Sequence, residues 1–382
     1  MVPIPDIDAT AAEARRRHGA ILVDVREPGE HATGVPVGAL AVPRAALEAE
    51  PARWLPDPDA EVLLVCGSGR RSRLAAEALA VRGYRRLASV AGGMEAWRGA
   101  GLPVGPGAGD DDFLERYSRH LRLPQVGVEG QRRLEAAKVL VVGAGGLGSP
   151  SAFYLAAAGV GTLVLVDDDV VDRSNLQRQI LHTEAGIGTP KVESAARALA
   201  ALNPRTRIDA RRERLVAGNV EALLSDVDVV LDGADNFPVR YLLSDACVRL
   251  GKPLVHGAVH RFEGQVSVFD AGRMRGAAPC YRCLFPEPPA PEDAPNCAEA
   301  GVLGVLPGVI GLLQATEVLK LLLGIGEPLR GRLLQFDALK MRFRETRLAP
   351  DPDCAVCAPG REFPGYAALQ ALCAAPGAGP AA

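Results

Sequence analysis

The sequence predicts an α/β protein of two domains, and three observations support this class. Short apolar stretches alternate with helical stretches in two blocks, which is the pattern of parallel sheets covered by helices. A seam rich in Gly, Pro and Asp, "GLPVGPGAGDDD" at 101–112, separates the blocks. The strand at 139–142 is apolar at every position and runs into a glycine-rich turn, which indicates a buried parallel sheet.

The elements of the first block follow the chain in a regular order. We expect strand 20–25, strand 61–66, helix 72–82, strand 86–93 and helix 94–100. The first domain is therefore placed at 1–104, and 105–112 is predicted to be a flexible linker because it has little to bury. The second domain, 113–358, begins with polar helices, and the Ala-, Pro- and Gly-rich segment 359–382 is predicted to be a flexible tail.

Composition and charge exclude several classes of function. The net charge is only −3 and the basic residues are scattered, so no nucleic-acid partner is expected. The N-terminus lacks the basic-then-apolar order of a secretory signal. The most apolar segment, 301–326, contains Pro307, Gln314, Glu317 and Lys320, so it predicts a buried helix and not a membrane span. Eight cysteines without a signal favour a reducing compartment, and we expect a cytoplasmic protein.

The clearest motif is "KVLVVGAGGLGSPSAFYLAAAGVGTLVLVDDD". Within "GAGGLG", Gly143, Gly145 and Gly148 satisfy G-x-G-x-x-G, with Gly146 beside them, and a helix follows. Glycines are needed where the backbone turns tightly and approaches phosphate at a helix N-terminus. The second strand ends in Asp167, where a ribose-binding carboxylate belongs. The combination predicts a nucleotide site; a tight turn without a ligand is the alternative.

The residues after this motif favour a triphosphate over a dinucleotide. Arg178 and Lys191 follow the acid and could neutralise a departing pyrophosphate, whereas dinucleotide sites need few such charges. Asp235, in "LDGADN" after a further strand, is well placed to hold Mg²⁺. A surface role is the alternative for each cation taken alone.

Two C-x-x-C pairs predict a metal site. The pairs "CYRC" (280–283) and "CAVC" (354–357) can together supply four thiolates to one tetrahedral ion. A closed shell of four thiolates leaves no position for water, so the expected zinc is structural. A redox disulfide and free buried thiols are the alternatives. The four ligands predicted are Cys280, Cys283, Cys354 and Cys357.

In "VLLVCGSGRRS", Cys66 follows an apolar strand and precedes a helix. A phosphate-attacking cysteine of the tyrosine-phosphatase type needs C-x5-R, but that position is Ser72, and a loop closed by Arg71 is one residue short. The smaller cradle fits the terminal sulfur of a persulfide. Backbone N–H groups, the helix N-terminus and Arg70 or Arg71 would favour the thiolate.

At this point the second block resembles the MoeB/ThiF family of adenylating enzymes, relatives of ubiquitin-activating enzymes. "GAGGLGS", "SNLQRQ", "TPKVESA" and "DGADN" carry the resemblance, from about Arg116 to Cys357. It implies a Rossmann-like domain that uses ATP and Mg²⁺ to activate the C-terminal Gly-Gly of a ubiquitin-like sulfur carrier, and several members carry zinc. The roles it implies are ribose binding for Asp167, phosphate binding for Asn175, Arg178 and Lys191, metal binding for Asp235 and pocket support for Gln179.

The same resemblance extends to assembly and to one further thiol. "RYSRH" matches the family's N-terminal segment, whose arginine, here Arg119, reaches the ATP site of a partner subunit, so a homodimer is implied. Cys297 lies where a cysteine in this family can bond the carrier during sulfur transfer, although it is dispensable in some members. The structural alternative for Cys297 stays open.

The first block resembles rhodanese domains, through "LVDVREPGEHATGVPVGALAVP", the Cys66 loop and "VAGGMEAWRGAGLPV". Rhodaneses accept sulfane sulfur on the loop cysteine, here Cys66; an inactive module with a buried thiol is the alternative. A sulfur donor such as a cysteine desulfurase is then expected. The rhodanese block precedes the adenylating block here, whereas it more often follows it.

Together the two blocks predict an adenylyltransferase that is also a sulfurtransferase. ATP adenylates the carrier carboxylate, the Cys66 persulfide displaces AMP, and a thiocarboxylate results. Four rivals remain: a nucleotide-dependent oxidoreductase, a tRNA-base dehydratase of the same superfamily, an enzyme for a thiamine- or cysteine-pathway carrier, and a zinc-containing scaffold that binds carrier without turning over ATP.

Overall fold

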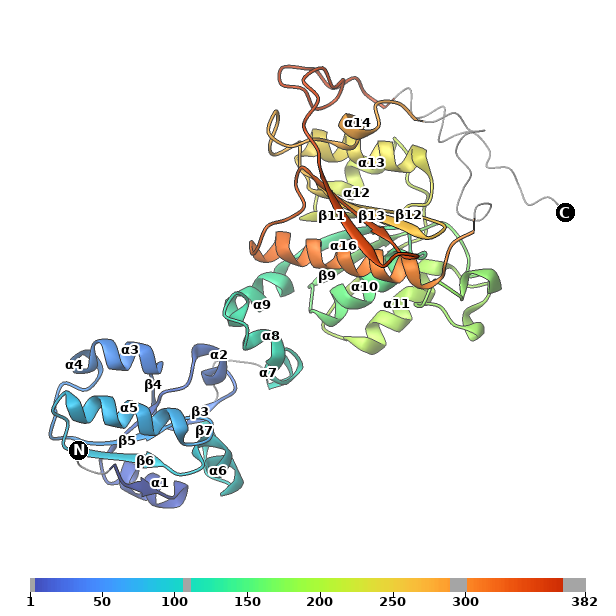
Figure 1. Ribbon diagram of the computed structural model, residues 1–382. Helices are drawn as coiled ribbons and strands as arrows, with labels where there is room; N and C mark the ends of the chain where they lie inside the picture. The colour runs from blue at the N-terminus through green and yellow to red at the C-terminus, as the bar shows by residue number, and fades with distance from the viewer. Residues whose placement is uncertain (1–3, 106–110, 289–300, 367–382) are drawn as a thin grey trace. The chain divides into compact units, whose positions relative to one another are not determined.

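The computed structural model describes residues 4–105, 111–288 and 301–366 (Figure 1). Contacts divide the chain into two units, Met1–Gln131 and Arg132–Ala382. The Gly-, Pro- and Asp-rich composition of 105–112 instead predicts the boundary there. The two divisions differ by α7 (Asp111–Arg116) and α8 (Ser118–Leu121), whose Phe113, Tyr117 and Leu121 form a small apolar cluster with Ala32 of the first unit.

The first unit is built on a parallel sheet with the strand order β1-β6-β5-β2-β4. Its strands are β1 (Asp6–Ile7), β2 (Ile21–Asp24), β4 (Leu40–Ala41), β5 (Glu61–Val65) and β6 (Arg86–Val90), and β3 (Val35–Pro36) pairs with β7 (Val104–Gly105). Its helices are α1 (Ala9–Arg17), α2 (Pro28–His31), α3 (Arg44–Ala49), α4 (Pro51–Trp54), α5 (Arg70–Val81) and α6 (Gly93–Gly99). The three predicted strands and two predicted helices are all present.

The second unit contains an eight-stranded sheet with the order β10-β9-β8-β11-β12-β13-β14-β15. The strands are β8 (Lys138–Val142), β9 (Thr162–Val166), β10 (Arg207–Arg211), β11 (Val229–Asp232), β12 (Leu254–His260), β13 (Glu263–Phe269), β14 (Arg332–Asp337) and β15 (Arg342–Arg347). The strands from β10 to β12 are parallel, and those from β12 to β15 are antiparallel. Ligands bind such sheets where the strand order reverses, here beside β8.

Helices cover both faces of this sheet (Figure 1). The helices of the unit are α9 (Gly127–Ala136, which crosses the boundary), α10 (Gly148–Ala157), α11 (Lys191–Leu202), α12 (Val220–Leu224), α13 (Phe237–Leu250), α14 (Tyr281–Leu284) and α16 (Val305–Leu323), with 3-10 turns η1 (Arg173–Asn175) and η2 (Glu184–Gly186). The side chains of β8 alternate between two apolar clusters: Val139 and Val141 face one, and Leu140 and Val142 the other. Burial on both faces explains why this strand is apolar throughout.

Helix α16 is, among the described residues, the one helix long and apolar enough to cross a membrane by length and composition. It packs against α10 and the strands β12 and β13, and Gln314 and Glu317 on it are buried. Its polar groups bond within the unit, since Gln314 donates to the Asp232 carbonyl and Glu317 accepts from Leu329 N–H. These contacts match the predicted buried helix.

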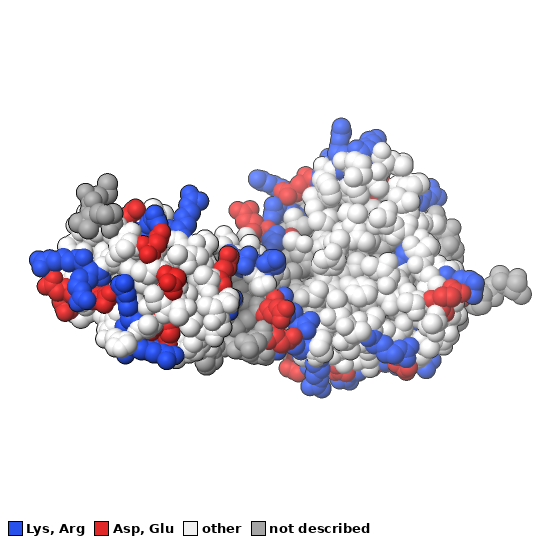
Figure 2. All heavy atoms as spheres, turned by 90° about the horizontal axis from the view of Figure 1, so that it is seen from below, with Lys and Arg blue, Asp and Glu red and all other residues white. Residues whose placement is uncertain are grey.

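The predicted linker and tail are only partly described. Gly105 belongs to β7, Asp111 begins α7, and 106–110 lie outside the described residues. The tail differs from the expectation near its start, because Phe363 packs against the cysteine cluster and the Tyr366 hydroxyl donates to Glu221. On the face drawn in Figure 2, basic and acidic side chains of the described residues lie side by side in both units.

Candidate functional site

The glycine loop after β8 has a backbone that side chains would obstruct. Gly143 has a φ of +90°, and a Cβ there would lie 2.6 Å from the Gly233 carbonyl oxygen. A Cβ on Gly148 would overlap the Gly143 carbonyl oxygen, and one on Gly146 would press on Pro307 at 3.2 Å. The glycines therefore let the loop pack against the β11 loop and the start of α16 while the α10 N-terminus stays open to an anion.

A cavity of about 340 Å³ lies over this loop, at the carboxyl ends of β8, β9 and β11. We name it the glycine-loop cavity. Eight predicted site residues line it: Gly143, Gly145, Gly146, Asp167, Arg178, Gln179, Lys191 and Asp235. Gly148 and Asn175 are not among its lining residues. Asn175 instead accepts a hydrogen bond from Asp172 N–H within η1.

Asp167 supports the loop as well as lining the cavity. Its Oδ2 accepts from Ala144 N–H at 2.8 Å and its Oδ1 from Asp169 N–H at 2.9 Å. Burial raises the pKa of this carboxyl, although Lys191 and the two backbone donors oppose the shift. Asp167 lines the cavity, and each of its oxygens can accept a further hydrogen bond, such as one from a ribose hydroxyl.

The two predicted cations both reach the cavity, and each has a partner. Lys191, the first residue of α11, donates to Asp169 Oδ2 at 2.7 Å, and its side chain is only 8% exposed. Arg178 donates to the Ser174 carbonyl at 3.0 Å. Asp169 is largely exposed, so its pair with Lys191 contributes little stability and can open at small cost.

Two polar residues beside the loop complete this side of the site. Gln179 lines the cavity and is buried, and its Oε1 is an acceptor that has no hydrogen-bond partner among the described residues. His182, which the sequence reasoning missed, lies within hydrogen-bond distance of the Ala144 carbonyl at 3.0 Å and of Ser194 Oγ. Burial lowers the pKa of His182, so the ring is neutral. Its burial, which fixes its role, was not readable from the sequence.

A second cavity of about 600 Å³ lies over the antiparallel half of the sheet. We name it the sheet cavity. It shares Asp235, Arg240 and Val259 with the glycine-loop cavity, so the two cavities are adjacent and meet at these residues. Its far side carries Lys340 and Arg342. The sequence predicted Asp235 as a Mg²⁺ ligand of the nucleotide site, but it did not predict this cavity or a role for Arg240, Val259, Lys340 and Arg342.

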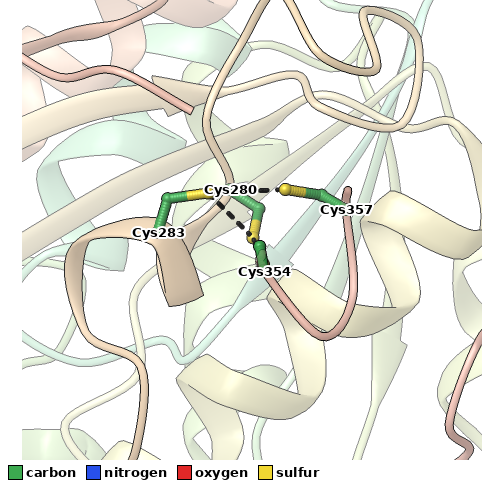
Figure 3. Close-up of side chains that lie close together, drawn as sticks. All are labelled: Cys280, Cys283, Cys354 and Cys357. Atoms are coloured by element: carbon green, nitrogen blue, oxygen red, sulfur yellow. Dashed lines mark hydrogen bonds between the residues drawn. The ribbon is translucent and has the colours of Figure 1, made fainter. Parts of the chain in front are cut away.

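The four predicted metal ligands converge (Figure 3). The sulfur-to-sulfur distances are 3.9 Å for Cys280–Cys283, 3.6 Å for Cys280–Cys354 and 3.4 Å for Cys283–Cys357. Bonds of about 2.3 Å from a tetrahedral zinc place sulfurs roughly 3.8 Å apart. Hydrogen bonding with Cys280 lowers the pKa of Cys283, whereas the pKa of Cys280 is raised by its thiol neighbours, so the four thiols share their protons unevenly. The donor set and spacing fit zinc.

In the first unit, the Cys66 thiol lies at the end of β5 under the N-terminus of α5 and is 1% exposed. Its sulfur accepts from Gly69 N–H at 3.2 Å and from Ser72 Oγ at 3.3 Å. Burial acts to raise its pKa, but the hydrogen bonds from Ser72, Ser68 and Gly69 outweigh burial, and the pKa is lowered. The hydrogen bonds of the loop therefore favour the thiolate form of Cys66.

Arg71 does not stand alone over this loop. Its guanidinium makes a bidentate pair with Glu30, at 2.5 and 2.6 Å, and this pairing raises the pKa of Arg71. Sequence reasoning assigned the thiolate's stability partly to an arginine and missed both Glu30 and the Ser72 hydroxyl. Neither partner was detectable, because both contacts depend on how the loop folds.

Two predicted residues stay predictions. Cys297 lies outside the described residues. Arg119 is exposed on α8, and its expected role concerns a partner subunit.

Comparison with known proteins connects both halves to families. Residues 117–356 match the model of the ThiF family, and residues 8–100 match the rhodanese-like domain. The chain is 54% identical over 251 residues to "SAMP-activating enzyme E1" of Haloferax volcanii, covering 66% of this chain and 91% of that protein. It is 54% identical over 245 residues to "Sulfur carrier protein adenylyltransferase" of Thermus thermophilus, covering 64% and 90%.

Two further matches cover less or share only the fold. The chain is 51% identical to "Probable adenylyltransferase/sulfurtransferase MoeZ" of Mycobacterium tuberculosis over 239 residues, which are 63% of this chain and 61% of that protein. The crystal structure of E. coli MccB superposes with a TM-score of 0.56 at 22% identity, covering 65% of this chain and 73% of that one. At this identity the structural match shows the fold alone.

Proposed function

We propose that this chain, which belongs to the ThiF family and carries a rhodanese-like domain, activates and thiolates a ubiquitin-like sulfur carrier. The carrier's C-terminal glycine is adenylated with ATP, and sulfur from a Cys66 persulfide then converts the carboxylate to a thiocarboxylate. The observation that carries the proposal is the junction of the two cavities at Asp235 and Arg240. A nucleotide in one cavity and a peptide end in the other meet there.

The adenylation step follows from the charges around the junction. The carrier carboxylate attacks the α-phosphorus of ATP, and pyrophosphate leaves toward Lys191 and Arg178, whose charges stabilise it. The glycine loop and the α10 N-terminus receive phosphate oxygens through N–H groups. Mg²⁺, when bound, neutralises phosphate charge, and Asp235 is the carboxylate placed to hold it.

The sheet cavity supplies the path for the carrier's C-terminal segment. Strands β12 to β15 form its floor, and Lys340 and Arg342 add positive charge at its far side. An extended Gly-Gly end is narrow enough to reach Asp235 along it. The basic residues complement an acidic carrier surface.

The sulfur step uses the thiol of the first unit. The terminal sulfur of the Cys66 persulfide attacks the acyl carbon and AMP leaves, giving an acyl disulfide. A second thiol attacks the Cys66 sulfur and releases the thiocarboxylate, with a disulfide as the other product. Cys297 is our candidate for that thiol. The persulfide is loaded by a protein donor such as a cysteine desulfurase.

The cysteine cluster is assigned a structural zinc. Cys280 precedes α14 and Cys283 lies within it, whereas Cys354 and Cys357 follow β15, so one ion would join two segments about 70 residues apart. We further place the protein in the cytoplasm, as a homodimer in which Arg119 completes the partner's ATP site.

Carrier-dependent ATP–pyrophosphate exchange tests the proposal. Asp235→Ala lowers exchange by roughly 100-fold or more, because the junction loses its carboxylate. Cys66→Ala leaves exchange intact but abolishes replacement of one carrier oxygen by sulfur, measured by mass spectrometry of the intact carrier. Asp226→Ala is the matched control, since Asp226 is exposed and pairs with Lys138. Full exchange in Asp235→Ala contradicts the proposal, as does NAD binding or carrier binding without ATP turnover.

A further inference from the structure

We propose that Asp232 and His256 form a buried positioning pair that fixes the loop presenting Asp235 to both cavities. The inference rests on the adenylation reaction proposed above and assigns it a residue, His256, that lines neither cavity. Asp232 ends β11 and His256 lies beside it on β12, in register. Both side chains are fully buried.

The contact between the two side chains has one arrangement. His256 Nδ1 lies 2.8 Å from Asp232 Oδ2, so this nitrogen carries the proton and donates. The opposite ring nitrogen, Nε2, lies 3.5 Å from Gln265 Nε2, which faces the sheet cavity. Burial lowers the pKa of His256, so the ring is a neutral donor to a buried carboxylate. The rings of Tyr281 and Phe269 pack against the imidazole.

The Asp232 carboxylate also holds the backbone of the loop that follows β11. Its second oxygen, Asp232 Oδ1, accepts from Ala234 N–H at 3.0 Å. The carbonyl of Ala234 accepts from Arg240 at 3.0 Å, and Gly233 N–H donates to the Val142 carbonyl at 2.8 Å. Residues 232–234 are thus held from three sides.

Asp235 is the next residue along the chain, and it is exposed to both cavities. Among the residues that the structure describes, its carboxylate accepts one hydrogen bond, weak at 3.3 Å, from Nδ2 of the neighbouring Asn236. Its position therefore depends on the backbone that precedes it. Without His256 the buried Asp232 carboxylate loses its side-chain donor, and its hold on Ala234 N–H weakens.

The test separates the hydrogen bond from the packing of the ring. His256→Phe keeps an aromatic ring without a donor, whereas His256→Asn places an amide N–H near the former Nδ1. We expect His256→Phe to lower kcat of carrier-dependent ATP–pyrophosphate exchange by roughly 10- to 100-fold, with KM for ATP within about twofold. His256→Asn restores kcat to within about fivefold of the native value.

Ser267→Ala is the matched control, because Ser267 is the cross-strand partner of His256, is equally buried, and donates to the Arg332 carbonyl. It leaves kcat unchanged. The inference is overturned if His256→Phe and His256→Asn lower kcat equally, or if neither lowers it. If His256→Phe does not fold by circular dichroism, His256→Gln replaces it, since its amide reaches the Nε2 position and not Asp232. A native protein without exchange refutes the proposed function instead.

Discussion

The loop after Cys66 and the loop after Val142 are built alike and end in different chemistry. Each follows an apolar parallel strand, turns through glycine and opens a helix whose N–H groups face an anion. The centre of the first loop is filled by its own thiol, which accepts hydrogen bonds from the loop. The second loop leaves a cavity of about 340 Å³. The same strand–glycine–helix arrangement therefore suits covalent transfer where a thiol occupies the centre of the loop. It suits ligand binding where the centre of the loop is an open cavity.

In both loops an acidic side chain forms an ion pair with the nearby cation. Arg71 is held by Glu30, and Lys191 by Asp169. Each acid keeps the cation in place before an anion arrives. The pairs differ in exposure, since Glu30 is 27% exposed and Asp169 is 66% exposed. The lysine can therefore leave its acid for a phosphate more easily than the arginine can leave Glu30.

The largest expected effect comes from placing a methyl group against the backbone of each loop. Gly148→Ala places a methyl group against the Gly143 carbonyl, and Gly93→Ala places one against the Cys66 carbonyl at a positive φ. Such overpacking lowers the free energy of unfolding by about 1–3 kcal/mol. Gly148→Ala is expected to abolish ATP–pyrophosphate exchange. Gly93→Ala is expected to abolish sulfur transfer and to leave that exchange intact. Thermal unfolding measures the loss of stability. ATP–pyrophosphate exchange and mass spectrometry of the carrier measure the two activities.

Gly218→Ala is the control, because a Cβ there meets nothing within 4 Å. If Gly148→Ala retained native exchange and melting temperature, the comparison of the loops would be wrong.

A smaller effect is expected when the contribution of Lys191 is separated from that of Asp169. Lys191→Ala is expected to lower ATP–pyrophosphate exchange by roughly 100-fold, because the departing pyrophosphate loses a buried charge. Asp169→Asn changes exchange by no more than about threefold, since it only frees the lysine. Lys138→Ala, which removes another ion-paired lysine of the same unit, serves as the control. Equal losses in Lys191→Ala and Asp169→Asn would mean that the ion pair itself is required.

The smallest expected effect concerns the thiol. Ser72→Ala removes a hydrogen bond that helps to lower the Cys66 pKa, so the pKa rises and less thiolate is present at a given pH below it. Loss of about 1 kcal/mol slows alkylation by iodoacetamide at neutral pH roughly fivefold. The pH profile of the rate moves to higher pH. Ser68→Ala is the control, because Ser68 contributes through its backbone N–H. An unshifted profile in Ser72→Ala would contradict this role.

Local pattern predicted much of the architecture and part of the site. The strand, glycines, helix, second strand and Asp167 were readable because each obeys a short-range rule, and the two C-x-x-C pairs were readable from thiol chemistry. The tertiary partners were not readable. Glu30 lies 41 residues from Arg71, and His256 lies 24 residues from Asp232, and nothing local connects them.

Ser72 shows a different kind of miss. Its position was read as the place where a phosphatase arginine is lacking, yet its hydroxyl is the side-chain donor to the thiol. The tail was missed for a similar reason. Ala, Pro and Gly dominate it, but Phe363 and Tyr366 find apolar and polar partners that only folding brings near.

The depth of Cys66 has a consequence for storage. A sulfur atom loaded on a thiol that is 1% exposed is shielded from small reductants and from peroxide, so the loaded enzyme should survive between turnovers. Transfer of this sulfur to the acyl carbon then requires the loop from Cys66 to Ser72 to open. We therefore expect the opening of this loop to limit the rate of sulfur transfer.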